Sequence, residues 1–253
     1  MVDVGKIMRD GKILILAYDQ GFEHGPTDFD ERGNEDPNYI LDIARKTGVY
    51  TGLVFQKGIA ERYWVGQNDL PPLVLKVNGK TSFHKGEEPV SLQLTSVDKA
   101  ASLGAVAVGY TIYVGSEHEE VMMQEFSRIC DEAHDKGLIS IMWAYPRGKH
   151  VEGRESSRDV VAYSARLGLE LGADVIKLPY TGDAESFSWV VKNAGKAMVV
   201  VQGGTKKDEA GLLEEVRGLM QAGAKGMAIG RNIWQGSDPV GLSKKIAEIV
   251  YAV

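Results

Sequence analysis

One lysine, Lys177, interrupts an otherwise apolar run at residues 175–178 and stands just before the turn-forming stretch PYTGD at 179–183. A lysine in a buried parallel strand costs free energy unless it has a function there. Burial disfavours the charged form of the amine and lowers its pKa, so that it can attack a carbonyl and form a Schiff base. The alternative is a strand-end lysine whose ammonium extends to solvent.

Three further residues could assist such an amine. Trp143 and Tyr145 are two positions apart in one apolar run and therefore share a face if the run is a strand. A phenol beside a protonated imine has a lowered pKa and can transfer protons, although the pair could equally be an aromatic cap on the core. Asp19 follows the first apolar run, where it could orient the amine, act as an acid or base, or be an ordinary loop residue. His24 lies in the same loop and is predicted at the edge of the site.

A phosphate site is predicted where two other apolar runs end. Gln202, Gly203 and Gly204 follow one run, and Gly230 and Arg231 follow the next. Glycines let the backbone N–H groups approach an anion closely, and a guanidinium can bind it with two parallel hydrogen bonds. The alternative is that the glycines only allow tight turns.

Eight short apolar runs alternate with amphipathic helical stretches along the chain, as expected for parallel strands that are buried on both faces. The runs cover residues 13–17, 52–55, 73–77, 105–109, 138–143, 175–178, 198–201 and 226–229, and the helices 37–46, 59–64, 97–103, 119–136, 157–171, 184–193, 209–222 and 238–251. This pattern predicts an α/β fold, a (β/α)₈ TIM barrel, with residues 1–253 as one domain. An open doubly wound sheet would need a glycine-rich turn after its first strand, where this chain has Asp19.

Chemistry in such barrels occurs at the carboxyl ends of the strands. Polar residues and glycines are concentrated at those positions: Tyr18, Asp19, Gln20 and Gly21; Gln56, Lys57 and Gly58; Asn78, Gly79 and Lys80; Tyr110 and Thr111; Tyr145, Pro146, Arg147 and Gly148; Lys177; Gly203 and Gly204; and Gly230, Arg231 and Asn232. This clustering favours a substrate site.

Composition excludes several other classes of function. The formal net charge of −6 argues against a nucleic-acid surface, and the apolar runs are too short to cross a membrane. The amino terminus lacks the pattern of a signal peptide, and a single cysteine, Cys130, suits a reducing cytoplasm. The five histidines lack the spacing of metal ligands, so no metal site is predicted.

Taken together, these segments resemble the archaeal-type class I fructose-1,6-bisphosphate aldolases, within the lysine aldolases that include deoxyribose-phosphate aldolase. The resemblance covers almost the whole chain and rests on ILAYDQGFEHGP at 15–26, VFQKGIAE at 54–61, GYTIY at 109–113, YPRG at 145–148, Lys177 with YTGD at 180–183, and GRN at 230–232. It implies that Lys177 forms the Schiff base, that Tyr145 transfers protons and that Asp19 assists. One departure is Gln20, which stands where the family usually has histidine.

The implied reaction is the reversible cleavage of fructose 1,6-bisphosphate into dihydroxyacetone phosphate and glyceraldehyde 3-phosphate, with no cofactor and no metal. The resemblance also implies a homo-oligomer, because family members form dimers of pentamers. Two alternatives remain open. One is a related lysine aldolase or transaldolase-like enzyme, of the aminoheptulosonate or autoinducer-sugar type. The other is a non-catalytic sugar-phosphate-binding barrel, which would not need Lys177 inside its mouth.

Overall fold

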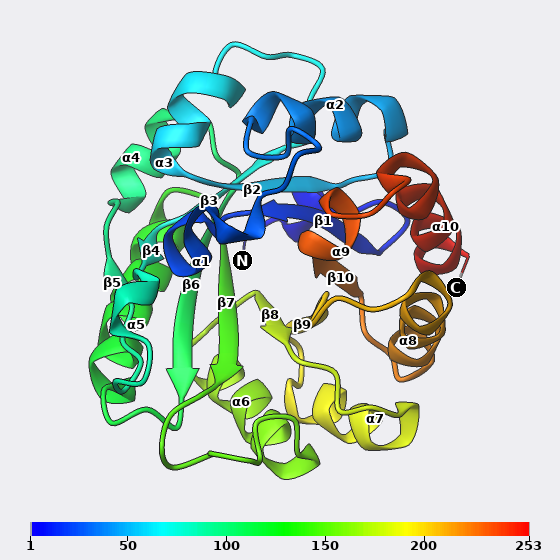
Figure 1. Ribbon diagram of the computed structural model, residues 1–253. Coiled ribbons are helices and arrows are strands. Elements are labelled where there is room, and N and C mark those ends of the chain that lie inside the picture. The colour runs from blue at the N-terminus through cyan, green and yellow to red at the C-terminus, as the bar shows by residue number, and fades with distance from the viewer. Residues whose placement is uncertain (1, 253) are drawn as a thin grey trace.

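A computed structural model describes residues 2–252 and shows a closed barrel of eight parallel strands surrounded by helices (Figure 1). Around the barrel the order is β1-β10-β9-β8-β7-β6-β3-β2, so each strand pairs with its predecessor and the last closes onto the first. The strands are β1 (Ile13–Tyr18), β2 (Gly52–Gln56), β3 (Leu73–Lys76), β6 (Ala107–Val114), β7 (Ile139–Pro146), β8 (Val175–Leu178), β9 (Met198–Gln202) and β10 (Gly226–Ile229). The predicted (β/α)₈ barrel is confirmed.

The helices cover the outside of the barrel, as Figure 1 shows. The main ones are α2 (Pro37–Thr47), α4 (Val97–Ser102), α5 (Glu119–Asp135), α6 (Arg158–Glu170), α7 (Ala184–Asn193), α8 (Glu209–Gln221) and α10 (Pro239–Tyr251). Aspartates cap several of them, since the side chains of Asp36, Asp183 and Asp208 accept hydrogen bonds from first-turn backbone N–H groups. These caps satisfy donors that would otherwise be unpaired at the helix starts.

The core has two layers because side chains alternate along each strand. In β1, Ile13 and Ile15 face the barrel interior, whereas Leu14 and Leu16 pack against the helices. The same alternation places Val175 of β8 in the interior cluster, so Lys177, two residues further on, also points inward. The strand pattern therefore fixes the direction of the lysine before any specific contact is made.

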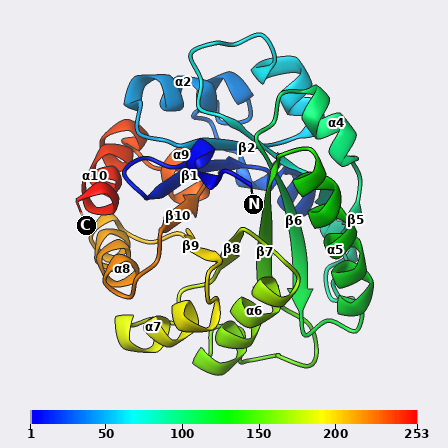
Figure 2. The ribbon, with the colours of Figure 1, turned by 180° about the vertical axis from the view of Figure 1, so that it is seen from behind.

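The far end of the barrel is closed by the amino-terminal segment (Figure 2). Its short 3₁₀ helix η1 (Val4–Ile7) buries Ile7 fully in the interior cluster, and Val2, Val4 and Met8 pack beside it. The barrel interior therefore opens to solvent at the carboxyl ends of the strands, where the site residues are predicted.

Two strands, β6 and β7, run three or more residues beyond their predicted ends. β6 and β7 pair continuously from Ala107↔Ile139 to Val114↔Pro146, so Tyr110 and Thr111, and likewise Tyr145, lie within strands and not after them. Aromatic and polar side chains are buried along this ladder, so polarity did not mark where the strands end.

The loops also contain elements that the sequence did not predict. These are α1 (Gly21–His24) with the 3₁₀ helix η2 (Gly25–Asp28), the hairpin of β4 (Asn78–Gly79) and β5 (Leu92–Gln93), the 3₁₀ helix η4 (Ser82–His84) and α9 (Arg231–Trp234). The helix predicted over 59–64 is instead α3 (Lys57–Ile59) followed by a π-helix, η3 (Ala60–Trp64). Each of these elements has five residues or fewer, which is too short to leave a periodic pattern in the sequence.

Candidate active site

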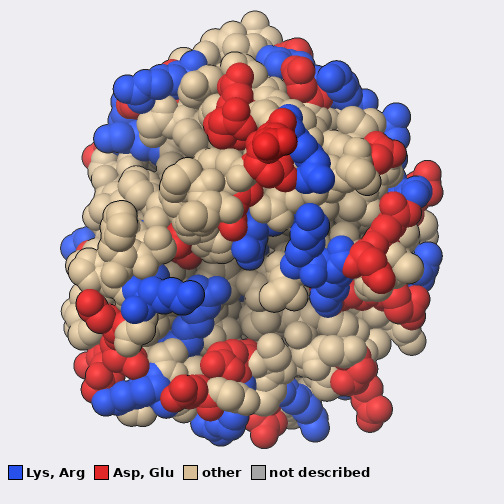
Figure 3. All heavy atoms as spheres, in the orientation of Figure 1, with Lys and Arg blue, Asp and Glu red and all other residues tan. Residues whose placement is uncertain are grey.

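A polar cavity opens at the carboxyl ends of the strands, and Figure 3 shows Lys and Arg side chains on either side of the centre of this face. Nine predicted site residues line it: Asp19, His24, Tyr145, Lys177, Gln202, Gly203, Gly204, Gly230 and Arg231. Five strands and the loops after them supply these residues, although their positions in the sequence span more than 200 residues. The structure therefore brings the predicted residues to one place.

Lys177 is almost completely buried, with 5% of its surface exposed. Among residues 2–252, no carboxylate oxygen lies within 4.0 Å of its ammonium nitrogen. Burial lowers the pKa of Lys177 to about 8, Asp19 and Glu23 oppose this, and the nearby charge of Lys76 adds to it. A substantial fraction of this amine is consequently neutral, and nucleophilic, at neutral to mildly alkaline pH.

Trp143 and Tyr145 surround the amine as predicted for residues on one face of a strand. Trp143 pairs in register with Lys177, and the lysine Nζ lies 5.4 Å from the Trp143 ring centroid and 5.8 Å from that of Tyr145. Trp143 is buried beneath the cavity and not part of its lining. Its ring occupies the space beside Gly109, where a Cβ would stand 1.7 Å from it, so only glycine fits there.

The Tyr145 phenol is protonated in the free site. Burial raises its pKa well above the usual value, the carboxylates of Asp19 and Glu23 raise it further, and Arg147 opposes them. The lowered pKa predicted for a phenol beside a protonated imine applies to a state that arises only after Lys177 has reacted. Before that step Tyr145 can donate a proton but not accept one.

A second buried lysine, Lys76 on β3, was missed by the sequence analysis. Its Nζ lies 3.7 Å from Oδ2 of Asp19 and 3.8 Å from Oε1 of Glu23, and 2% of the residue is exposed. Like Lys177, Lys76 interrupts an apolar run, at residues 73–77, but it was not predicted as a site residue. The signal that could have found it is alternation, because Val74 faces the interior and Lys76 is two residues further on.

The predicted phosphate end is built by the turns after β9 and β10. Gly230 must be glycine, because a Cβ there would stand 2.6 Å from the Ala17 carbonyl oxygen. Asn232 holds the two turns together: its side-chain amide donates to the Gly203 and Thr205 carbonyls at 2.7 and 3.2 Å, and its oxygen accepts from Lys207 N–H. The loop backbone after β9 and the start of α9 thus meet at one part of the cavity wall, a region referred to below as the cradle.

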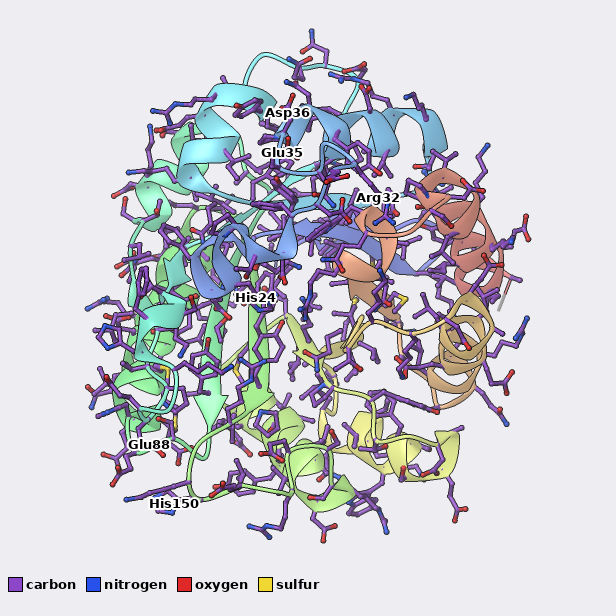
Figure 4. The ribbon with its side chains drawn as sticks, viewed as in Figure 1. His24, Arg32, Glu35, Asp36, Glu88 and His150 are labelled. Atoms are coloured by element: carbon purple, nitrogen blue, oxygen red, sulfur yellow. The ribbon has the colours of Figure 1, made fainter. Side chains whose placement is uncertain are left out.

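Arg231 and His24 meet at one carboxylate beside this cradle. His24 Nδ1 lies 2.6 Å and Arg231 Nη1 lies 3.6 Å from Oδ2 of Asp28. Figure 4 shows His24 on α1, near the centre of the barrel face. Gln20, the departure from the family pattern, lines the same wall, and its buried side-chain oxygen has no hydrogen-bond partner among residues 2–252.

Within residues 2–252, no cluster of three or more His, Cys, Asp or Glu side chains is arranged to hold a metal ion. The helices of the same range include none long and apolar enough to span a bilayer.

Two lysines, Lys76 and Lys177, line the cavity. Lys76 has carboxylate partners within ion-pair distance, and Lys177 has none among residues 2–252. A barrel with an unpaired, desolvated amine at its mouth defines the class of enzymes that work through a lysine Schiff base. The profile of the DeoC/LacD family aldolases matches residues 13–236, and the chain belongs to this family.

Curated relatives narrow the activity. The chain is 51% identical over 245 residues to a protein of Thermoproteus tenax called fructose-bisphosphate aldolase class 1, covering 96% of this chain and 91% of the relative. A Halobacterium salinarum protein of the same name is 42% identical, with coverage of 97% and 92%. An archaeal fructose-1,6-bisphosphate aldolase, solved with its catalytic Lys covalently bound to the carbinolamine intermediate of the substrate, superimposes with a TM-score of 0.92 at 49% identity, covering 98% of this chain and 97% of that one.

Proposed function

We propose that Lys177, Tyr145 and Asp19 carry out the class I aldolase reaction in this chain. The chain cleaves fructose 1,6-bisphosphate reversibly into dihydroxyacetone phosphate and glyceraldehyde 3-phosphate through a lysine Schiff base, without a metal or another cofactor. The observation that carries the assignment of residues is the burial of Lys177 without a carboxylate partner among the described residues, which keeps its amine partly neutral.

The reaction starts when neutral Lys177 attacks the C2 ketone and the resulting carbinolamine loses water to give an iminium. Asp19 removes the proton of the C4 hydroxyl, and the C3–C4 bond breaks to release glyceraldehyde 3-phosphate. The bonding electrons move to the iminium and leave an enamine. Tyr145 protonates the enamine at C3, and water then releases dihydroxyacetone phosphate from the iminium. Protonated Asp19 gives its proton to solvent and Tyr145 takes one from solvent, so both return to their starting states. The two proton carriers are distinct because burial keeps the Tyr145 phenol protonated at the outset.

Two cationic parts of the cavity lining suit the two phosphates of the substrate, and Trp143, whose ring centroid lies 5.4 Å from Lys177 Nζ, is proposed to support the reacting carbons through that lysine. One cationic part is the cradle of Gly203, Gly204 and Gly230 with Arg231. The other centres on Arg147, whose guanidinium lies 5.6 Å from the Tyr145 ring centroid. A second hollow continues from Tyr145, Arg147 and Gln202 towards Ser156 and leaves room for the far end of a six-carbon chain.

The direct test is to map the trapped intermediate. Borohydride added with dihydroxyacetone phosphate should reduce an iminium and leave a stable adduct, and peptide mapping should place it on Lys177. The same sample without sugar phosphate is the control. An adduct on Lys57 or Lys80, or none at all, would refute the assignment. A non-catalytic sugar-phosphate barrel would also give none.

Substitution of the phosphate cradle tests the second part of the proposal. Arg231→Ala should raise KM for fructose 1,6-bisphosphate by about 10- to 100-fold, since a charge-assisted contact contributes about 1.5–3 kcal/mol. kcat should change much less. Arg166→Ala, which breaks an exposed ion pair with Glu170 on α6, is the matched control and should have no effect. An unchanged KM in Arg231→Ala would remove Arg231 from the site.

We further propose that residues 1–253 act as one domain, in a cytoplasmic homo-oligomer. Strands from residue 13 to residue 229 close a single barrel, which supports one domain. The family resemblance supports the oligomer, and the lone cysteine supports a reducing compartment.

A further inference from the structure

The cavity contains a buried group of three charged side chains, Asp19, Glu23 and Lys76. The reaction above uses Asp19 but gives no role to Glu23 or Lys76. Lys76 contacts both Asp19 and Glu23, and the side chains of all three are at most 13% exposed. A buried ammonium is costly unless carboxylates compensate it, and a buried carboxylate has the same need. Each member of the group therefore depends on the others for its position and charge.

We propose that Lys76, held by Glu23, is the positioning residue that fixes the Asp19 carboxylate for proton transfer and sets the charge balance around Lys177. This inference rests on the proposed function and adds a role for two residues outside it. Lys76 Nζ lies 5.6 Å from the same Trp143 ring that Lys177 approaches, so the two lysines are neighbours across one aromatic side chain. What distinguishes the two lysines is that Lys76 has two carboxylate partners within ion-pair distance, whereas Lys177 has none among residues 2–252.

The charge balance gives the arrangement a catalytic meaning. Two carboxylates and one ammonium carry a formal charge of −1 while Lys177 is neutral, and the group becomes neutral when Lys177 turns into an iminium. The site thus stabilises the cation that forms during the reaction. Without Lys76 the carboxylates of Asp19 and Glu23 would lose the ammonium that both of them contact. Asp19 would then no longer be held in place as a base.

Lys76→Met tests this role and Lys76→Arg should rescue it. Loss of a positioned acid–base group typically costs about 10²–10⁴-fold in rate, so we expect kcat to fall by about 100-fold or more in Lys76→Met, with a smaller change in KM. Lys76→Arg keeps the charge and both carboxylate contacts and should remain within about tenfold of the unmutated enzyme. Thermal unfolding of both variants separates these effects from loss of the fold.

The pH profile supplies a readout that a purely structural lysine would not change. The charged or titratable groups facing Lys177 are Asp19, Glu23, Lys76 and Tyr145. Removing the positive charge of Lys76 makes protonation of Lys177 easier, so the acidic limb of kcat/KM should move to higher pH in Lys76→Met. In Lys76→Arg it should stay in place.

Glu23→Gln completes the test, because Glu23 is inferred to act through Lys76. It should lower kcat in the unmutated enzyme but add little in the Lys76→Met background. Additive effects, unchanged kcat in Lys76→Met, failure of Lys76→Arg to rescue, or a borohydride adduct on Lys76 would each overturn the inference. If the adduct still maps to Lys177 in any of the first three cases, the proposed function stands and only the role of Lys76 fails.

Discussion

Lys177→Met should abolish cleavage of fructose 1,6-bisphosphate while leaving a protein that is more stable than the original. Methionine is close to lysine in length and has no amine, so neither a carbinolamine nor an iminium can form. Activity should fall to the uncatalysed background, and borohydride should trap no dihydroxyacetone phosphate. The side chain lies in the barrel interior with 5% exposure, where an apolar residue suits the surroundings better than an ammonium does.

The gain in stability should depend on pH. Burial lowers the pKa of Lys177 from 10.5 to about 8, a difference that corresponds to about 3 kcal/mol. Below pH 8 the folded and unfolded chains both carry the proton, so the folded state bears the whole cost of the buried charge. Between pH 8 and 10.5 the folded chain has released the proton that the unfolded chain still binds, and the stability of the unmutated protein rises. The advantage of Lys177→Met is therefore largest below pH 8 and shrinks towards pH 10.5.

Urea unfolding at pH 7 and pH 10.5 measures this difference. Lys80→Met is the matched control, because Lys80 is only partly buried, lies over the Tyr113 ring and does not line the cavity. It should keep its activity, its adduct on Lys177 and its original dependence on pH. If Lys177→Met retains activity, or if its stability relative to the unmutated protein does not change with pH, Lys177 is not the buried nucleophile.

The sequence was sufficient to predict the barrel because its signal is redundant. Eight apolar runs recur with helices between them, and an error in one run would not change the fold. Lys177 could be predicted because a lone charge in an apolar strand is conspicuous and strand ends are where barrel chemistry occurs. The positions of Gly203, Gly204 and Gly230 at the cavity were predictable for a similar reason, since each glycine lies in a turn that follows an apolar run.

Lys76 and Glu23 could not be predicted in the same way, because their roles arise from contacts between distant segments. Lys76 interrupts an apolar run just as Lys177 does, but its partners Asp19 and Glu23 come from the loop after another strand, so the group of three charges appears only in the fold. Asn232 was seen as part of a motif, but its hydrogen bonds to the turn after β9 depend on how that turn folds. The rise in the pKa of Tyr145 also required the structure, because it depends on burial by neighbouring strands.

Tyr145→Phe should stop turnover after the Schiff base has formed. The substitution keeps the aromatic ring, whose centroid lies 5.8 Å from Lys177 Nζ and 5.6 Å from the Arg147 guanidinium, and removes only the hydroxyl. Lys177 remains buried and partly neutral, so attack on the ketone is unaffected. Protonation of the enamine at C3 then lacks its donor, and the loss of a general acid typically costs about 10²–10⁴-fold in rate.

The variant should therefore separate covalent capture from turnover. Borohydride should still trap dihydroxyacetone phosphate on Lys177, whereas kcat for cleavage should fall by about 10²–10⁴-fold and exchange of the C3 proton of dihydroxyacetone phosphate with solvent should slow in parallel. Tyr113→Phe is a close control, since Tyr113 pairs with Tyr145 across β6 and β7 and its buried hydroxyl has no hydrogen-bond partner among residues 2–252. It should turn over at nearly the original rate. If Tyr145→Phe matched it, Tyr145 would be an aromatic cap on the core, and the proton that reaches C3 would have to come from Asp19 or from water.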